Sequence, residues 1–139
     1  MDRTYFDRWH ERRKHTLPGV LDFAFEAPEP GIIHGRFTVA EKHMSSNGYL
    51  HAGTAVTFAD TACGLGAMTN RPSGAEGFTT VELKANFLGT AKIGDTLEVT
   101  ARLVHGGRTT QVWDAEVVDA PSGRKLSVFR CTQMLFYPK

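Results

Sequence analysis

Asp60 is the only charged residue between Gly53 and Asn70, in a stretch where the other side chains are small, apolar or hydroxyl-bearing. Such a stretch predicts a helix that is buried over most of its surface. An ionised carboxylate costs several kcal/mol to bury there unless it is paired or hydrogen-bonded. A carboxylate in this setting can act as a general base or as a nucleophile, so Asp60 is a candidate catalytic residue. The alternative is a structural Asp that caps a neighbouring backbone or lies at the solvent end of the helix.

A polar loop over residues 41–53 leads into this helix and ends in His51, Ala52 and Gly53. The first backbone N–H groups of a helix are unpaired and carry a partial positive charge, so they can stabilise a developing oxyanion. Ala52 and Asp60 are eight positions apart, which is about 12 Å along a helix axis. One chain therefore cannot bring both groups to the same carbonyl, and we expect a second copy of the chain to complete the site.

An aromatic helix is predicted near the N-terminus, over residues 4–15. Tyr5, Phe6 and Trp9 are spaced three and four positions apart and share one helical face. Pro18–Gly19 is expected to end this helix. Three aromatic side chains on one face indicate that the helix docks on its own domain.

Alternating apolar and polar residues, separated by turn residues, predict strands in most of the remaining chain. The expected strands cover 20–27, 32–40, 81–87, 97–103, 109–119 and 125–137. One long antiparallel sheet wrapped around one central helix satisfies this order of elements. We therefore predict an α+β fold in one domain, residues 1–139, with an N-terminal helix in residues 1–17 packed on it.

Composition excludes several classes of function. The 139 residues carry a net charge of +1, which favours neither nucleic acid nor membrane as a partner. No apolar run approaches the roughly 20 residues of a membrane span, so a soluble, cytoplasmic protein is expected. Cys63 and Cys131 lie in apolar segments and are expected to be buried thiols. The histidines have no metal-ligand spacing, so no metal site is expected, and His43 is expected at the surface.

The motif Asn47-Gly-Tyr-Leu-His51-Ala-Gly53, followed by Asp60, resembles the Asn-x-x-Gly-x-x-His-Gly-Gly…Asp signature of one enzyme family. These are the hotdog-fold acyl-CoA thioesterases of the phenylacetate-degradation (PaaI-like) type, in the 4-hydroxybenzoyl-CoA thioesterase superfamily. The stretches 77–88 and 91–97 resemble the third strand of that family and the turn after it. The resemblance covers about residues 18–137.

The resemblance implies a hotdog fold and a homodimer with its active sites at the dimer interface, usually paired into a tetramer. Asp60 would activate water or attack the thioester of an aryl or medium-chain acyl-CoA, releasing the free acid and coenzyme A. The N–H of Ala52, beside Gly53, would meet the thioester oxygen, and His51 would orient the loop and support substrate binding. Thr80 lies where relatives carry a hydroxyl that positions water. No cofactor is implied, because coenzyme A is part of the substrate.

Two positions depart from the family pattern. Ala52 stands where the family has Gly, and an Ala is tolerated there if its φ is negative. The polar amide of the family falls six positions before His51, which is Ser45 in this chain. Asn47 lies two positions later, so Ser45 and Asn47 are both candidates for that role.

The substrate would bring phosphates and an acyl group. Basic residues that could contact coenzyme A are Arg108, Lys84, Lys92 and Arg130. Phe78 is a candidate to line the acyl pocket, together with Phe58, Leu65, Met68 and Phe87.

Three other functions compete with hydrolysis. A hotdog protein could bind acyl-CoA without turnover. A hotdog hydratase or dehydratase is a second alternative, although in the hydratases the histidine follows the acid, whereas His51 precedes Asp60 here. A structural dimer with no activity is the third.

Overall fold

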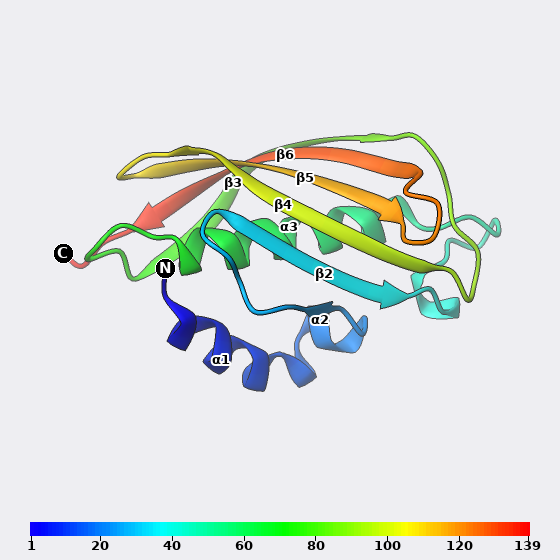
Figure 1. Cartoon of the computed structure of the whole chain (residues 1–139), viewed down its shortest axis with the longest axis horizontal. Coiled ribbons are helices and arrows are strands. Elements are labelled where there is room, and N and C mark those ends of the chain that lie inside the picture. Colours follow the sequence, from blue (N-terminus) through cyan, green and yellow to red (C-terminus); the bar gives the residue numbers. More distant parts are fainter.

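Helix α3 (Ala52–Thr69) is the central element of the computed structural model, which describes all residues from 1 to 139. A six-stranded antiparallel sheet with the order β1-β2-β4-β5-β6-β3 curves around one side of this helix. Figure 1 shows β5 and β6 above α3 and the N-terminal helices below it. The predicted long antiparallel sheet around one central helix is therefore confirmed.

The strands are β1 (Ala24–Phe25), β2 (Ile32–Thr38), β3 (Gly77–Phe87), β4 (Thr96–Gly106), β5 (Thr110–Asp119) and β6 (Lys125–Phe136). Inward-facing apolar residues alternate with outward-facing polar ones, as in β4, where Leu97, Val99 and Ala101 are buried. β3 follows α3 in the chain and pairs only with β6, so it forms one edge of the sheet.

Glycines in α3 allow the sheet to approach the helix closely. A Cβ on Gly64 would lie 2.7 Å from the ring of Phe78, and a Cβ on Gly66 would lie 2.5 Å from the ring of Trp113. Both distances are below van der Waals contact, so these rings occupy the space that a side chain would need. The sheet therefore packs on α3 through large side chains of the strands and small residues of the helix.

The N-terminal segment consists of α1 (Arg3–Arg12), the 3₁₀ turn η1 (Arg13–His15) and α2 (Leu17–Val20). The predicted N-terminal helix is confirmed, but the strand predicted over 20–27 is wrong over most of its length. Pro18 lies inside the short helix α2, where its fixed φ suits the first helical turn. Asp22 then turns the chain with a φ of 59°, so that only Ala24–Phe25 pairs with β2.

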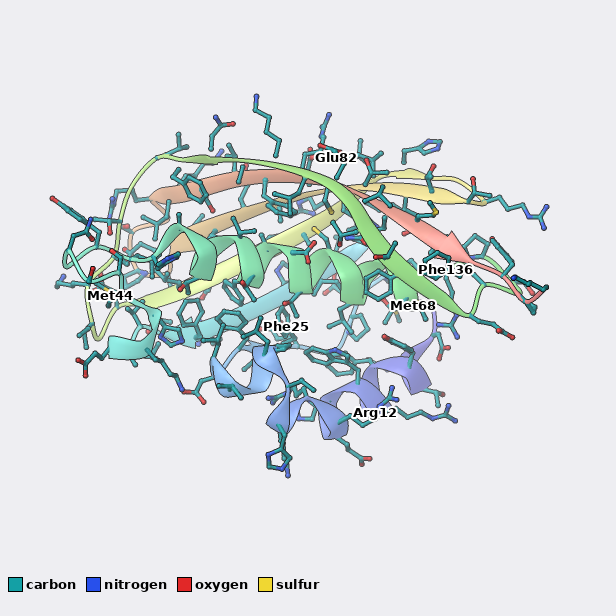
Figure 2. All side chains as sticks on the ribbon, turned by 180° about the vertical axis from the view of Figure 1, so that it is seen from behind. Arg12, Phe25, Met44, Met68, Glu82 and Phe136 are labelled. Atoms are coloured by element: carbon teal, nitrogen blue, oxygen red, sulfur yellow. The ribbon has the colours of Figure 1, made fainter.

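Helix α1 covers the side of α3 that the sheet leaves open. Phe6 is buried in the core, and the Trp9 ring meets the Phe25 ring edge-on, with centroids 5.5 Å apart. In Figure 2, Phe25 lies between α3 and the N-terminal helices. Asp2 caps α1 by accepting a hydrogen bond from the Tyr5 N–H at 3.0 Å and pairs with Arg71 at 2.7 Å. This cap ties the start of the chain to the segment that follows α3.

Candidate active site

Asp60 lies in the middle of α3, on the side that faces β3, and is half-buried. Its Oδ1 accepts a hydrogen bond from the Thr80 hydroxyl at 2.8 Å. None of the ion pairs of the chain involves Asp60. The carboxylate is therefore held by a neutral hydroxyl, and its charge is not committed to a neighbouring cation. The structure thus brings Asp60 and Thr80 together.

The backbone of β3 is irregular next to Thr80. The pairing of β3 with β6 matches Thr80 to Gln133 and then skips to Glu82 opposite Thr132. A bulge of this kind inserts one extra residue and changes the direction of the neighbouring side chains. Thr80 consequently faces inward to Asp60, whereas the Glu82 carboxylate hydrogen-bonds the Thr132 hydroxyl and lies away from α3 in Figure 2.

The N-terminus of α3 is capped by a histidine ring. Nδ1 of His51 accepts a hydrogen bond from the Gly53 N–H at 2.8 Å, which requires that Nδ1 carries no proton. The Thr54 N–H donates to the His51 carbonyl at 2.9 Å. The N–H of Ala52 has no partner within the chain, and Ala52 is exposed. Ala52 therefore presents the free backbone donor at this helix end, and Gly53 does not.

Ser45 and Asn47 shape the loop before His51. The Ser45 hydroxyl hydrogen-bonds Asn47 Oδ1 and the Tyr49 carbonyl, the latter at 2.9 Å. Asn47 Oδ1 also accepts from the Tyr49 N–H at 3.3 Å. Both side chains are thus bonded within their own loop in this chain, and neither contacts Asp60.

His43 anchors the same loop from inside the protein, so the expectation that it lies at the surface is wrong. It is fully buried, and its Nδ1 accepts from the Ala40 N–H at 2.8 Å. Its carbonyl accepts from the His51 N–H at 3.0 Å and from the Thr54 hydroxyl at 2.9 Å. The ring packs on Phe37 with centroids 4.6 Å apart. Its place directly before Met44, in an otherwise polar loop, gave no signal of this burial.

The predicted contacts for coenzyme A and the acyl group lie in different places. Phe78 is two residues from Thr80 and packs over Gly64, on the same side of α3 as Asp60. Arg130 forms a two-point ion pair with Asp114 on the outer face of the sheet, and Lys84 lies opposite Arg130 in the strand register. Arg108 lies in the β4–β5 turn with its guanidinium 5.1 Å from the centre of the Tyr137 ring. Only Phe78 among these four lies next to the Asp60 side of the helix.

Gln133 is a polar neighbour of the site that the sequence motif does not include. Its side chain is fully buried in β6 and lies 3.0 Å from the Thr80 hydroxyl. The available signal was its position: Cys131, Gln133 and Leu135 alternate on the inward face of the last strand. A polar residue among buried apolar ones is informative in the same way as Asp60.

Two further properties bear on partners and ligands. No three histidine, cysteine, aspartate or glutamate side chains gather as a metal-binding group. No helix is long and apolar enough to cross a membrane.

Known proteins resemble this chain in sequence and in structure. The 1,4-dihydroxy-2-naphthoyl-CoA hydrolase of Listeria monocytogenes is 34% identical over 116 residues, covering 84% of this chain and 92% of that protein. A Streptococcus mutans structure bound to acetyl CoA aligns with a TM-score of 0.78 and 26% identity, covering 90% of this chain and 97% of the other. The E. coli PaaI protein, from the phenylacetic acid degradation operon, shares the fold with a TM-score of 0.83 at 20% identity, covering 96% and 94%.

These similarities agree with the resemblance seen in the sequence motif, and they confirm the predicted hotdog fold and the predicted enzyme class, a thioester hydrolase. The family described as the Thioesterase superfamily matches residues 47–125, which include both ends of the candidate site. Because this match spans more than half of the 139 residues, the chain belongs to the thioesterase superfamily.

Proposed function

We propose that this protein hydrolyses acyl-CoA thioesters to the free acid and coenzyme A, with Asp60 as the catalytic carboxylate. The observation that carries this proposal is the single hydrogen bond from Thr80 to Asp60 Oδ1. That bond fixes one carboxylate oxygen and leaves Oδ2 available to a water molecule or to the substrate. Asp60 is half-buried, so a ligand can reach it.

The chemistry needs little more than these groups. As a general base, Asp60 removes a proton from the water that attacks the thioester carbonyl. As a nucleophile, it forms an acyl-enzyme anhydride that water then hydrolyses. In both routes the thiolate of coenzyme A leaves with little acid assistance, and a backbone N–H stabilises the oxyanion. We propose no metal and no cofactor, because coenzyme A enters as part of the substrate.

The oxyanion donor is proposed to come from a second copy of the chain. Ala52 and Asp60 lie on the same continuous helix, eight positions apart, which places them about 12 Å from one another along its axis. The edge strand β3 is the surface through which we expect two copies to pair, because an unpaired edge of 11 residues can hydrogen-bond another strand. Large apolar side chains are exposed on and just after this strand: Val81, Leu83, Phe87 and Leu88.

The proposed dimer places Ala52 of one copy, with its capping residue His51, opposite Asp60 of the other. Ser45 and Asn47 would then shape a loop that reaches the partner's half of the site. We further propose that two such dimers associate into a tetramer.

The acyl group is proposed to be aryl or medium-chain, with Phe78 lining its pocket. The hydrolase of Listeria monocytogenes named above acts, by its name, on an aryl acyl-CoA. Binding of coenzyme A is proposed from the acetyl CoA complex of the Streptococcus mutans relative. Arg108, Lys84 and Arg130 stay predictions as contacts for its phosphates.

A panel of aryl and aliphatic acyl-CoAs tests the proposal, with release of free thiol as the measurement. We expect Asp60→Asn to lower kcat by about a hundredfold or more, because the amide keeps the shape but cannot accept the proton. Circular dichroism must show the same fold for both proteins. Full activity of Asp60→Asn would refute the assignment, and binding of acyl-CoA without thiol release would favour a protein that binds without turnover.

A further inference from the structure

We infer that Gln133 is a positioning residue of this site, whose side-chain amide donates to Thr80 and thereby directs the hydroxyl proton of Thr80 to Asp60. This inference rests on the proposed hydrolysis at Asp60. Gln133 lies directly opposite Thr80 in the pairing of β3 with β6. It does not touch Asp60 in the hydrogen-bond network, so it acts through Thr80.

The number of protons available at Thr80 limits which hydrogen bonds it can donate. The Thr80 oxygen lies 2.8 Å from Asp60 Oδ1 and 3.0 Å from the atom placed as Gln133 Oε1, and the atom placed as Nε2 lies toward Cys131. A threonine hydroxyl carries one proton and can accept two hydrogen bonds. An ionised Asp60 is an acceptor only, and it is the stronger acceptor because it is charged. The proton of Thr80 therefore goes to Asp60, and the Gln133 amide must donate if it is to bond Thr80.

The orientation of the amide follows from this count. The nitrogen and oxygen of a glutamine amide have nearly the same shape, so the surrounding hydrogen bonds decide which end faces which neighbour. With Nε2 toward Thr80, Gln133 donates to Thr80 and Thr80 donates to Asp60. With Oε1 toward Thr80, Asp60 Oδ1 and Gln133 Oε1 would compete for the single hydroxyl proton of Thr80. One of these two acceptors would then have no hydrogen bond from Thr80. At 0% exposure no solvent water can supply the missing bond.

The neighbour at the other end of the amide accommodates the same orientation. The atom placed as Nε2 lies 3.3 Å from Cys131 Sγ, and Cys63 is the neighbour of that sulfur. Both cysteines are fully buried. Burial, reinforced by the nearby Cys131, raises the pKa of the Cys63 thiol well above its ordinary value. A thiol can donate as well as accept, so with Nε2 turned toward Thr80 the Cys131 thiol donates to the amide oxygen and each donor in the series points toward Asp60.

The decisive variant is Gln133→Met, which keeps the length of the side chain and removes the donor. We expect kcat to fall about tenfold while KM changes less than about twofold, because the lost bond orders a catalytic partner and does not bind substrate. In a Thr80→Val background, Gln133→Met should leave kcat unchanged within about twofold, because the Thr80 hydroxyl through which Gln133 acts is absent.

Gln111→Met is the matched control. Gln111 lies opposite Gln133 on the neighbouring strand β5 and is equally buried. It bonds Trp113 Nε1 and the Asn70 carbonyl and contacts neither Thr80 nor Asp60. We expect Gln111→Met to lower the melting temperature but not kcat. The inference is wrong if Gln111→Met reproduces the tenfold loss, or if Gln133→Met lowers kcat equally with and without the Thr80 hydroxyl.

A second measurement decides the inference without activity. The side-chain amide resonance of Gln133 in a ¹⁵N–¹H spectrum should shift in Thr80→Val and exchange slowly with solvent. If Cys131→Ala moves the amide protons and Thr80→Val does not, the amide faces the other way and the inference fails. Full activity of Asp60→Asn would instead overturn the proposed function, so the two failures are distinguishable.

Discussion

One helix carries both halves of the candidate site, but the two halves are built in different ways. At the N-terminus of α3, Gly53 bonds His51 two positions away, and Thr54 bonds His43 eleven positions away. In the middle of α3, Asp60 bonds Thr80 across 20 positions, and Thr80 meets Gln133 across 53. The first half depends on a local loop, whereas the second depends on the packing of two strands against a helix.

The two halves also differ in how their polar groups are satisfied. The N-terminal half leaves the Ala52 N–H exposed and unpaired. In the central half, Thr80 donates to Asp60 Oδ1 at 2.8 Å and lies 3.0 Å from the Gln133 amide. An unpaired donor suits an oxyanion that exists only during reaction, while a carboxylate held through one oxygen suits a group that must keep one orientation.

The largest effect is expected from Ala52→Pro, which removes the free N–H. His51 already has φ −65° and ψ 128°, the backbone region that a residue before proline requires, and proline is favoured at the first helical position. The fold should therefore survive. We expect kcat to fall by about a hundredfold, because one oxyanion donor is lost. Thiol release and circular dichroism measure the two quantities.

Mixing Ala52→Pro with Asp60→Asn tests whether the two halves come from different chains. Each variant alone lacks one group at every site. After co-refolding, about half of the dimers are mixed, and each mixed dimer has one intact site, so about a quarter of wild-type activity should return. No recovery, with mixed dimers demonstrated by mass spectrometry, would mean that both groups act within one chain.

A smaller loss of rate is expected from Thr80→Val, which removes the hydroxyl from the central half. Because the lost hydrogen bond is the one from Thr80 to the Asp60 carboxylate, we expect kcat to fall about tenfold or more. Thr79→Val is the control, because Thr79 is exposed on the same strand and makes no side-chain hydrogen bond. Equal kinetics of the two variants would contradict the role assigned to Thr80.

The cap of the N-terminal half is tested by measuring the stability of the fold, not kcat. His51→Ala removes the acceptor of the Gly53 N–H, and we expect the free energy of unfolding to fall by about 1 kcal/mol. His51→Asn should retain most of that stability, since Asn is a good cap. Thermal denaturation of both variants, with His105→Ala as an exposed control, separates the loss of the cap from the loss of a histidine.

Asp2 lies outside both halves, and we expect its substitution to have the smallest effect on kcat. The Tyr5 N–H and the Arg71 guanidinium hold the pKa of Asp2 below its ordinary value of 3.8. Asp2 therefore stabilises the fold above that value and loses this contribution as the pH falls through its lowered pKa. Asp2→Ala should cost about 1 kcal/mol at neutral pH and nothing at the acidic end. Urea unfolding across this range, with Asp7→Asn as control, measures the difference; kcat should not change.

The division between the two halves also explains what the sequence could predict. His51, Ala52 and Asp60 were predicted because a polar loop before an apolar helix is a local pattern, and the sheet followed from alternation. Gln133 was missed because its partner depends on the register of β3 on β6, including the skipped Val81. The strand over 20–27 was too long because apolar residues there fit a helical turn as well as a strand, and Pro18 favours the turn.

The close approach at Gly64 has an evolutionary consequence. The Phe78 ring occupies the space that a Cβ at position 64 would need, and Phe78 is two residues from Thr80 on the same strand. The distance between the Asp60 carboxylate and the Thr80 hydroxyl therefore depends on the absence of a side chain at Gly64. In related sequences, an alanine at position 64 should be accompanied by a smaller residue at position 78. Libraries that seek wider acyl specificity should therefore vary these two positions as a pair.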